Sequence, residues 1–431
     1  MTVVVALTIV TFLISFGLIA TERVHRVTAA LGGVAVMVLL GAVDAHSAFF
    51  SEKTGIDWNV IFLLLGMMIT VSVLKHTGVF DYLAIWAAQR SRGKSFRLMV
   101  ILVLLTAVVS AFLDSVTVML LIAPVTLAVC QRLRLPVVPF LIAEVLAANI
   151  GGTATLIGDP PNIMIGSRAG LTFTDFLFNL APITVGLLVV FIGLCRVLFR
   201  EAFLDAEEHM TEIMQLNGNE SIRDHRLLRR CLVVVCAVVL AFVLHGPIGI
   251  DPAFVGLLGA GLMVLVSRTT APEFLQEVDW STLVFFMGLF VMVGGLVNVG
   301  VIDTLGRAAI GLVGDDYLVA ATGLLVGSAV IGGMIDTIPF VATTIPIVEE
   351  LVATVPDPEA SQALWWSLAL GADLGGNTTA IGASANVVAI GWAARNGYTI
   401  SFWQFTQYGL VVTAVTIALS TLYVWLRYFA F

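Results

Sequence analysis

The sequence is poor in charged residues. Only 12% of its 431 residues are Asp, Glu, Lys or Arg, whereas 59% are hydrophobic and the mean hydropathy is +1.04. Soluble globular proteins carry about a quarter charged residues, because a water-facing surface needs ionisable side chains. The shortage therefore argues against a soluble protein, and a net charge of −8 gives no basic face for nucleic acid. A chain of this composition is expected in a lipid bilayer.

Recognisable catalytic and cofactor motifs are absent as well. The sequence has no HExxH, no GxSxG and no Walker A motif, and its four cysteines show no CxxC spacing. We therefore expect neither an enzyme nor a bound cofactor, and any use of ATP would need a partner protein. Cys130, Cys195, Cys231 and Cys236 are predicted to be free thiols in packed helices, with a thiol site for a metal or metalloid as the alternative.

What the sequence does have is long apolar runs. About twenty apolar residues suffice to cross a bilayer. Eight uninterrupted spans are predicted, at 3–20, 27–43, 58–74, 183–198, 231–244, 252–266, 281–299 and 408–426. The first lacks the basic start and the small-residue cleavage site of a signal peptide, so we expect it to be retained. Four further apolar stretches are interrupted by polar, Gly and Pro residues, at 97–134, 137–169, 317–355 and 362–395.

The stretch at 97–134 is predicted to be a re-entrant hairpin. Lys and Arg accumulate in cytoplasmic loops, and basic residues lie at both ends of this stretch, between Arg90 and Arg97 and again at Arg132 and Arg134. A single crossing cannot return to the side on which it began, so the polar break at 114–117 is expected to be the tip of a hairpin inside the membrane. Such non-helical backbone is tolerated only where protein buries it or a cavity hydrates it.

The two halves of the sequence repeat each other. A shift of 222 residues aligns Asp57-Trp58 with Asp279-Trp280, and a shift of 224 aligns the segment 149–158 with 373–382. Apolar composition alone would make Leu and Val coincide, but not Asp-Trp, Gly-Gly and Asn in one register. The other matched pairs are Gly66 with Gly288, Gly78 with Gly300, Asp81 with Asp303, Asp114 with Asp336, Pro124 with Pro346 and Asn162 with Asn386.

The repeat predicts an inverted architecture. Each unit has five spans and a hairpin, and an odd number of crossings forces the second copy to insert upside down. We expect an all-α polytopic membrane protein of two inverted repeats, with about ten transmembrane helices, two re-entrant hairpins and two unwound (broken) helices. The N-terminal repeat is predicted at 1–199, a cytoplasmic linker at 200–230 and the C-terminal repeat at 231–431. Inverted repeats with broken helices are typical of secondary transporters, whose site lies between the repeats.

Four polar breaks are predicted to converge at that site. The Gly pairs at 151–152 and 375–376 are expected to let the backbone unwind, and the prolines Pro160, Pro161 and Pro339 remove helical hydrogen bonds. The alternative is that these residues only satisfy broken backbone and help the helices to pack. The predicted substrate-binding residues are Ser115, Thr117, Asn149, Gly151, Gly152, Thr153, Thr155, Asn162, Thr337, Asn377, Thr378, Thr379 and Asn386.

Acidic residues fall within the same membrane-depth stretches. A carboxylate there costs several kcal/mol unless it is paired, hydrated or protonated, so proton or ion coupling is predicted for Asp114, Asp159, Asp336 and Asp373, and less strongly for Glu144. Asp57 and Asp279 are instead expected to cap helices at the interface. No Lys, Arg or His lies within the breaks. We therefore expect a site poor in cations, which favours a cation, a proton or a neutral hydroxylated solute.

The breaks carry a resemblance to a known family. The segments 149–162 (NIGGTATLIGDPPN) and 372–386 (ADLGGNTTAIGASAN), together with 336–340 (DTIPF), look like signatures of the ion transporter superfamily. Within it the sequence resembles the group that holds the bacterial arsenite permease ArsB and the melanosomal P protein. The resemblance implies a scaffold domain and a transport domain with elevator-like movement, often in a homodimer. Where dicarboxylate carriers have Ser-Asn-Thr at the hairpin tips, this sequence has Asp-Ser-Val-Thr and Asp-Thr-Ile-Pro.

The sequence and the resemblance together predict a secondary transporter in the cytoplasmic (inner) membrane. The leading hypothesis is proton-coupled efflux of arsenite or antimonite, because arsenite at neutral pH is mainly an uncharged trihydroxide that suits Thr, Asn and Asp. Exchange of sodium or another small ion against protons is the alternative, and a dicarboxylate or other anion is less favoured. A passive channel stays open. ArsB-like carriers work alone on the proton gradient or with a soluble ATPase, so such a partner also stays open.

Overall fold

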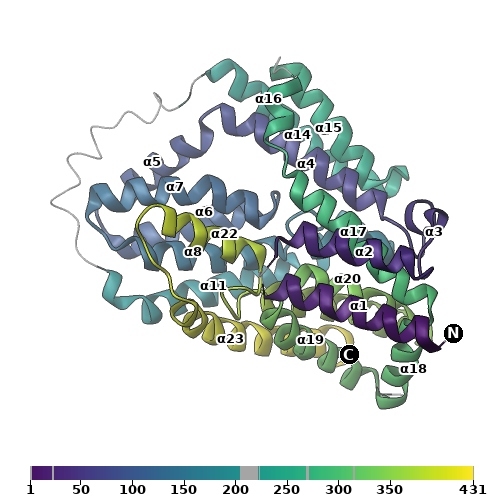
Figure 1. Ribbon diagram of the computed structural model, residues 1–431. Coiled ribbons are helices and arrows are strands. Elements are labelled where there is room, and N and C mark those ends of the chain that lie inside the picture. The colour runs from purple at the N-terminus through teal and green to yellow at the C-terminus, as the bar shows by residue number, and fades with distance from the viewer. Residues whose placement is uncertain are drawn as a thin grey trace.

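Helices form all the regular secondary structure that the computed structural model describes, which covers residues 2–21, 24–203, 222, 224–267, 271–313 and 316–430 (Figure 1). This confirms the predicted all-α class. The helices before the centre of the chain are α1 (Thr2–Ala20), α2 (Arg26–Leu39), α3 (Ala45–Phe49), α4 (Trp58–His76), α5 (Val79–Ser91), α6 (Ser95–Ser110), α7 (Ser115–Leu133), α8 (Val137–Gly152), α9 (Pro160–Ala169), α10 (Phe173–Asn179), α11 (Ala181–Leu198) and the short 3-10 helix η1 (Arg200–Ala202).

The second half repeats this order of long and short helices. Its elements are α14 (His225–Ile248), α15 (Pro252–Ser267), α16 (Ala271–Gln276), α17 (Trp280–Asn298), α18 (Val301–Val313), α19 (Tyr317–Met334), α20 (Thr337–Val352), α21 (Pro358–Gly375), α22 (Ser384–Arg395) and α23 (Phe402–Tyr428). Asp57 and Asp279, which the sequence repeat aligns, begin α4 and α17 and accept hydrogen bonds from the first-turn amides of those helices. The predicted capping role of both residues is confirmed.

Eight of the described helices are long and apolar enough to cross a membrane, and four shorter apolar helices accompany them. At 1.5 Å per residue, eighteen residues extend about 27 Å, close to the thickness of the hydrocarbon core. The predicted span at 27–43 ends earlier, at Leu39, and the one at 231–244 is longer, from His225 to Ile248. Residues 204–221 and 223 of the predicted linker lie outside the described part of the chain, and its last six residues belong to α14.

The two halves pack against each other reciprocally. Helix α2 lies along α17, and its counterpart α15 lies along α4 (Figure 1). In the same way α7 contacts α22, while α20 contacts α9. The contact between α4 and α15 is close enough that a Cβ added to Gly66 would lie 2.5 Å from the Gly256 carbonyl carbon. Reciprocal pairing of this kind is the mark of a two-fold relation, so the repeat seen in the sequence is also a repeat of the packing.

Each half contains one helical hairpin and one broken helix. The hairpins are α6–α7 and α19–α20, with tips at 111–114 and 335–336, and the broken helices are α8–α9 and α21–α22, interrupted at 153–159 and 376–383. The expectation that the Gly pairs unwind the backbone is wrong for Gly151, Gly152 and Gly375, because all three are still helical. A Cβ on Gly151 would overlap the Ala107 carbonyl oxygen of α6, and one on Gly375 would lie 2.5 Å from Ala329 Cα of α19. These glycines let each broken helix lie tightly on its hairpin.

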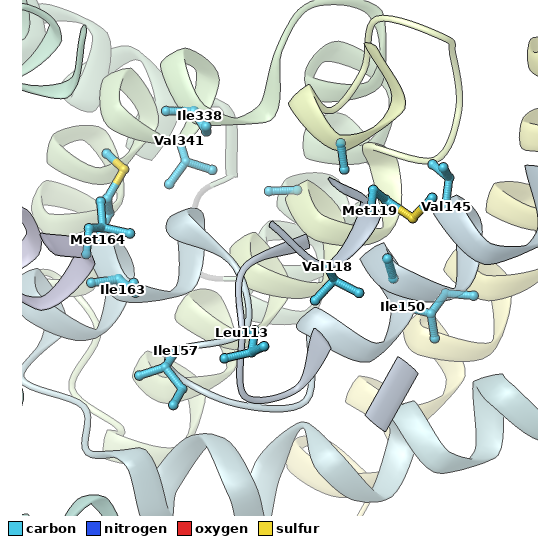
Figure 2. Close-up of a cluster of buried hydrophobic side chains, with 14 of the residues drawn as sticks. Leu113, Val118, Met119, Val145, Ile150, Ile157, Ile163, Met164, Ile338 and Val341 are labelled. Carbon is cyan, nitrogen blue, oxygen red and sulfur yellow. The ribbon is translucent and has the colours of Figure 1, made fainter. Parts of the chain in front are cut away.

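An apolar cluster surrounds the first hairpin tip and the first break (Figure 2). Its side chains come from both halves of the chain, because α20 contributes to it beside α7, α8 and α9. Packing from both halves fixes where each interrupted backbone segment lies. The labelled members are Leu113, Val118, Met119, Val145, Ile150, Ile157, Ile163, Met164, Ile338 and Val341.

Candidate functional site

Four helix N-termini meet at the centre of the molecule. Asp114 caps α7 by accepting from Thr117 N at 2.9 Å, and Asp336 caps α20 by accepting from Ile338 N at 3.0 Å. The other two N-termini are those of α9, which follows Asp159, and α22, which begins at Ser384. Hydrogen bonds join them in pairs, since Ser115 Oγ donates to Asp159 at 3.4 Å and Ser384 Oγ donates to Asp336 at 3.0 Å. Helix N-termini carry partial positive charge, and here three carboxyl groups offset it.

These N-termini border a small cavity of about 120 Å³. Helices α4 and α17 close it on the side away from the hairpins. Its polar and charged lining residues are Arg26, Ser72, Lys75, Asp114, Thr117, Glu277, Asp279, Thr282 and Ser384.

A second cavity of about 330 Å³ lies next to the first. It is lined by the end of α1, the segment before α2, the tip residue Asp336 and the first turns of α22, and it shares Arg26 and Ser384 with the small cavity. Arg26 Nη1 donates to Ser384 Oγ at 3.2 Å. This contact therefore stands between the two cavities.

Arg26 corrects the expectation of a site poor in cations. Its guanidinium donates to Thr282 Oγ1 at 2.7 Å, lies 3.8 Å from Asp279 Oδ2 and stacks over Phe285 at 5.5 Å. The sequence placed Arg26 outside the breaks, as a loop charge after the first span. Only the packing of α2 on α17 brings it to the hairpin tips.

Asn162 and Asn386 form equivalent hydrogen bonds across the two breaks. Asn162 Nδ2 donates to the carbonyl oxygens of Gly152 and Thr155 at 3.3 and 3.1 Å, and Asn386 Nδ2 donates to those of Gly376 and Thr379, both at 2.8 Å. Each amide thus bridges from the helix after a break to the backbone before it. The two sets match at the offset of 224 that the sequence repeat gives.

Asn149 links the two breaks. Its Nδ2 donates to Asn377 Oδ1 at 2.9 Å and to Asn386 Oδ1 at 3.0 Å, while Asn377 Nδ2 donates back to Leu146 O at 3.2 Å. The three amides are buried. They form a network between the halves rather than a surface open to either cavity.

The threonines of the breaks bond to backbone or to each other. Thr153 donates to Asn149 O at 3.0 Å, Thr155 to Ala111 O, and Thr379 to Gly333 O at 2.6 Å. Thr378 donates to Thr413 Oγ1 of α23 at 3.3 Å. The hydroxyls of Thr155, Thr378 and Thr379 thus hold the breaks against the hairpins and α23, whereas that of Thr153 bonds within α8.

The predicted site residues therefore fall into two groups. Asp114, Thr117 and Asp336 line the cavities, and Ser115, Asp159 and Thr337 lie at the same hairpin tips and helix starts. The remaining residues form a buried network behind them, which consists of Asn149, Gly151, Gly152, Thr153, Thr155, Asn162, Asp373, Asn377, Thr378, Thr379 and Asn386. Sequence reasoning missed the other polar and charged residues that line the small cavity, which are Arg26, Ser72, Lys75, Glu277, Asp279, Thr282 and Ser384.

The described residues contain no group of three or more His, Cys, Asp or Glu side chains arranged to hold a metal ion. All four cysteines are free, with Cys130, Cys195 and Cys231 buried and Cys236 exposed. Burial of Cys130, Cys195 and Cys231 agrees with the predicted packing of the thiols in helices, whereas the exposure of Cys236 does not.

Comparison with known proteins identifies the family of this chain. The family described as citrate transporter, CitMHS, matches residues 16–371. The chain belongs to the CitMHS family. This CitMHS member is 53% identical over 426 residues to an uncharacterized transporter of Mycobacterium tuberculosis, with 99% of both chains covered. It is 34% identical to the P protein of Homo sapiens, covering 95% of this chain and 58% of that protein, so the predicted resemblance to the P protein is confirmed.

The fold of the CitMHS chain also matches a solved transporter. The YdaH transporter of Alcanivorax borkumensis superposes with a TM-score of 0.62 at 13% identity, covering 98% of each chain. The likeness shows a shared polytopic transporter fold. Together with the family, it makes this chain a multi-pass membrane transporter.

Proposed function

We propose that the chain is a secondary transporter that exports arsenite or antimonite across the cytoplasmic membrane against protons. The observation that supports this most is the small cavity, which four helix N-termini and Asp114 border, with Asp159 and Asp336 hydrogen-bonded to the same helix starts. Its volume of about 120 Å³ suits a solute with few heavy atoms. Carboxylates accept hydrogen bonds from a trihydroxide, and the N–H groups of the helix starts donate to its oxygens.

Proton coupling follows from the same carboxyl groups. A carboxylate at a hairpin tip accepts a hydrogen bond from a hydroxyl of the cargo. Once protonated, the carboxyl group donates its hydrogen to a neighbouring oxygen, and the cargo is released. Asp336 is suited to this exchange because it lines the larger cavity and is bonded to Ser384, which faces Arg26. Movement of the hairpins and breaks against α2, α4 and α17 would then pass the cargo between the cavities.

An anion is the second candidate, because Arg26 lies at the site and the family is described as citrate transporter. The charges of the lining weigh against a tricarboxylate. Arg26 already faces Asp279, and Lys75 is paired with Glu277 at 3.4 Å. With Asp114 the small cavity has three acidic groups and two basic ones. A multiply charged anion would have to displace both pairs.

Exchange of sodium or another small ion against protons is the third candidate, since it would use the same carboxyl groups. It requires sodium to change transport and the stability of the cargo-free protein. A homodimer and a soluble ATPase partner belong to the same proposal, as the arsenite permease group implies them.

The test is uptake into everted membrane vesicles from cells that express the chain. Arsenite uptake should rise when the vesicle interior is acidic and should fall to the level of vesicles without the protein when the gradient is collapsed. Asp336→Asn should remove the response to the gradient. Arsenite uptake equal to that of the control vesicles would overturn the cargo, and the same vesicles then report whether citrate or sodium takes its place.

A further inference from the structure

The repeat gives the Asn149–Asn386 hydrogen bond an equivalent place between the broken helices, where an acid stands instead of an amide. The repeat aligns Asn149 with Asp373 and Asn386 with Asn162. Asn149 Nδ2 donates to Asn386 Oδ1 at 3.0 Å. On the other side of the two-fold relation, the Asp373 carboxyl lies against Asn162 and Thr153. The two places are equivalent under the repeat, and of the two only the place of Asn149 has a hydrogen bond among the described residues.

The orientation of both receiving amides is fixed by the backbone. Asn386 and Asn162 each direct their Nδ2 to two carbonyl oxygens, which leaves Oδ1 to face the other half. Asn386 Oδ1 receives a hydrogen from Asn149. Asn162 Oδ1 is buried and receives none from the described residues. The position that should supply that hydrogen is occupied by Asp373.

No described residue donates a hydrogen bond to the carboxyl oxygens of Asp373. The side chain is buried, and neither oxygen accepts a hydrogen bond of acceptable geometry. The amide hydrogens of Asn162 and the hydroxyl hydrogen of Thr153 are committed to carbonyl oxygens. An ionised carboxylate would therefore face oxygen acceptors in a buried place, which is strongly unfavourable. A neutral carboxyl has the shape of an asparagine amide and carries the missing hydrogen.

No cation among the described residues compensates Asp373. Elements α8, α9, α19, α20 and α23 pack against α21. Their charged and titratable side chains are Glu144, Arg168, Tyr317, Glu349, Glu350, Tyr408, Tyr423, Arg427 and Tyr428. None of these cations forms an ion pair with Asp373.

We propose that Asp373 is a positioning residue whose carboxyl is protonated in this structure and donates to Asn162 Oδ1, as Asn149 donates to Asn386. One link between the broken helices is then permanent and the other requires a proton. Loss of that proton opens the second link and frees the α8–α9 break from α21. The proposal deepens the transport function proposed above and rests on it for its transport readout, while its stability readout needs no cargo.

The experiment is a thermal-stability profile of the purified full chain in detergent between pH 5 and pH 9. Asp373→Asn supplies the hydrogen from an amide at every pH, so its thermal midpoint should fall less than that of the wild type as the pH rises. Asp373→Leu removes the link and should lower the midpoint at low pH by about 2 °C, the size expected for one hydrogen bond in a large chain.

Asn149→Asp is the matched variant, because it makes the permanent link depend on a proton as well. Its midpoint should fall more steeply with pH than that of the wild type. Two results would overturn the proposal. One is a thermal midpoint that changes with pH in the same way in the wild type and in Asp373→Asn. The other is a midpoint of Asp373→Asn at pH 5 that is as low as that of Asp373→Leu. In vesicles, we expect uptake by the wild type to decline toward alkaline pH, where the proton-dependent link is lost. The Asp373→Asn variant should still take up arsenite, without that decline. A failure of arsenite transport in the wild type leaves the stability profiles unaffected, so the two proposals fail separately.

Discussion

Arg26 donates to Ser384 across 358 positions of sequence, at 3.2 Å. Arg26 comes from the start of α2, which lies along α17, and Ser384 from the first turn of the second broken helix. The bond joins the helices that close the site on one side to the breaks and hairpin tips on the other. It also places the one guanidinium of the cavity lining next to the hydroxyl that bonds Asp336.

Replacement of Arg26 tests this bond. Arg26→Lys keeps the charge but cannot donate to Thr282 and Ser384 together with the geometry of a fork. We expect uptake to fall about tenfold, which corresponds to about 1.4 kcal/mol, and Arg26→Gln to fall further. Uptake is measured in everted vesicles at equal protein level. Arg168→Lys is the control. Arg168 Nε lies 3.7 Å from Asp57 Oδ2, and neither residue lines the small cavity. An equal loss in both variants would contradict a special role for Arg26.

Asp159 provides a test of coupling with a built-in comparison. The repeat aligns it with Ala383, which precedes α22 as Asp159 precedes α9. Because the second half folds with alanine there, Asp159→Ala should fold with an unchanged thermal midpoint. Uptake should lose its response to an imposed pH gradient. A variant that keeps the response would remove Asp159 from the coupling groups.

Asn386 is predicted to be a structural residue of the break. It donates to two carbonyl oxygens and accepts from Asn149, so Asn386→Ala leaves several buried polar groups without a partner. Each costs about 1–3 kcal/mol, and the thermal midpoint should drop clearly. Asn396→Ala is the control, because the Asn396 side chain donates to Trp392 O at an exposed position. Equal midpoints for the two variants would show that the break is held by other contacts.

Gly151 and Gly375 should not tolerate a side chain. The Cβ of an alanine at either position would overlap the backbone of the hairpin that precedes it in the sequence. Overpacking of this kind costs about 1–3 kcal/mol. Gly186 in α11 has nothing within 4 Å of an added Cβ, so Gly186→Ala should be neutral or stabilising by up to about 1 kcal/mol. Thermal unfolding in detergent measures all three, and a stable Gly151→Ala protein would contradict the tight contact.

Acid should loosen the start of α14. Backbone hydrogen bonds from Leu227 and Arg226 hold the pKa of Asp224 below its ordinary value. A lowered pKa means that the cap contributes above the ordinary value of about 3.9 and is lost as the pH falls through the folded value. Hydrogen exchange of the first-turn amides of α14 should therefore rise below about pH 4. Asp224→Asn should show no such rise.

The sequence by itself determined the helical class, the spans, the repeat and the four interruptions. These are local or periodic features: apolar length decides what can cross lipid, and the matched residues serve the same local purpose in both halves. Asp-Trp begins a helix, Gly-Gly allows close helix packing and Asn bridges a break. Asp114 and Asp336 could be assigned to hairpin tips before any coordinates, since a polar turn inside an apolar run has few other places to go.

Tertiary structure alone decided which polar residues face a cavity and which close the backbone. The amides of Asn162 and Asn386 look like ligands in the sequence, but they donate to carbonyl oxygens that the interrupted helices leave without partners. Asn149 donates instead to the side-chain oxygens of Asn377 and Asn386. Arg26 looks like a loop charge until α2 packs on α17. Such assignments depend on contacts between residues hundreds of positions apart, and no local pattern encodes a distance across the two-fold relation.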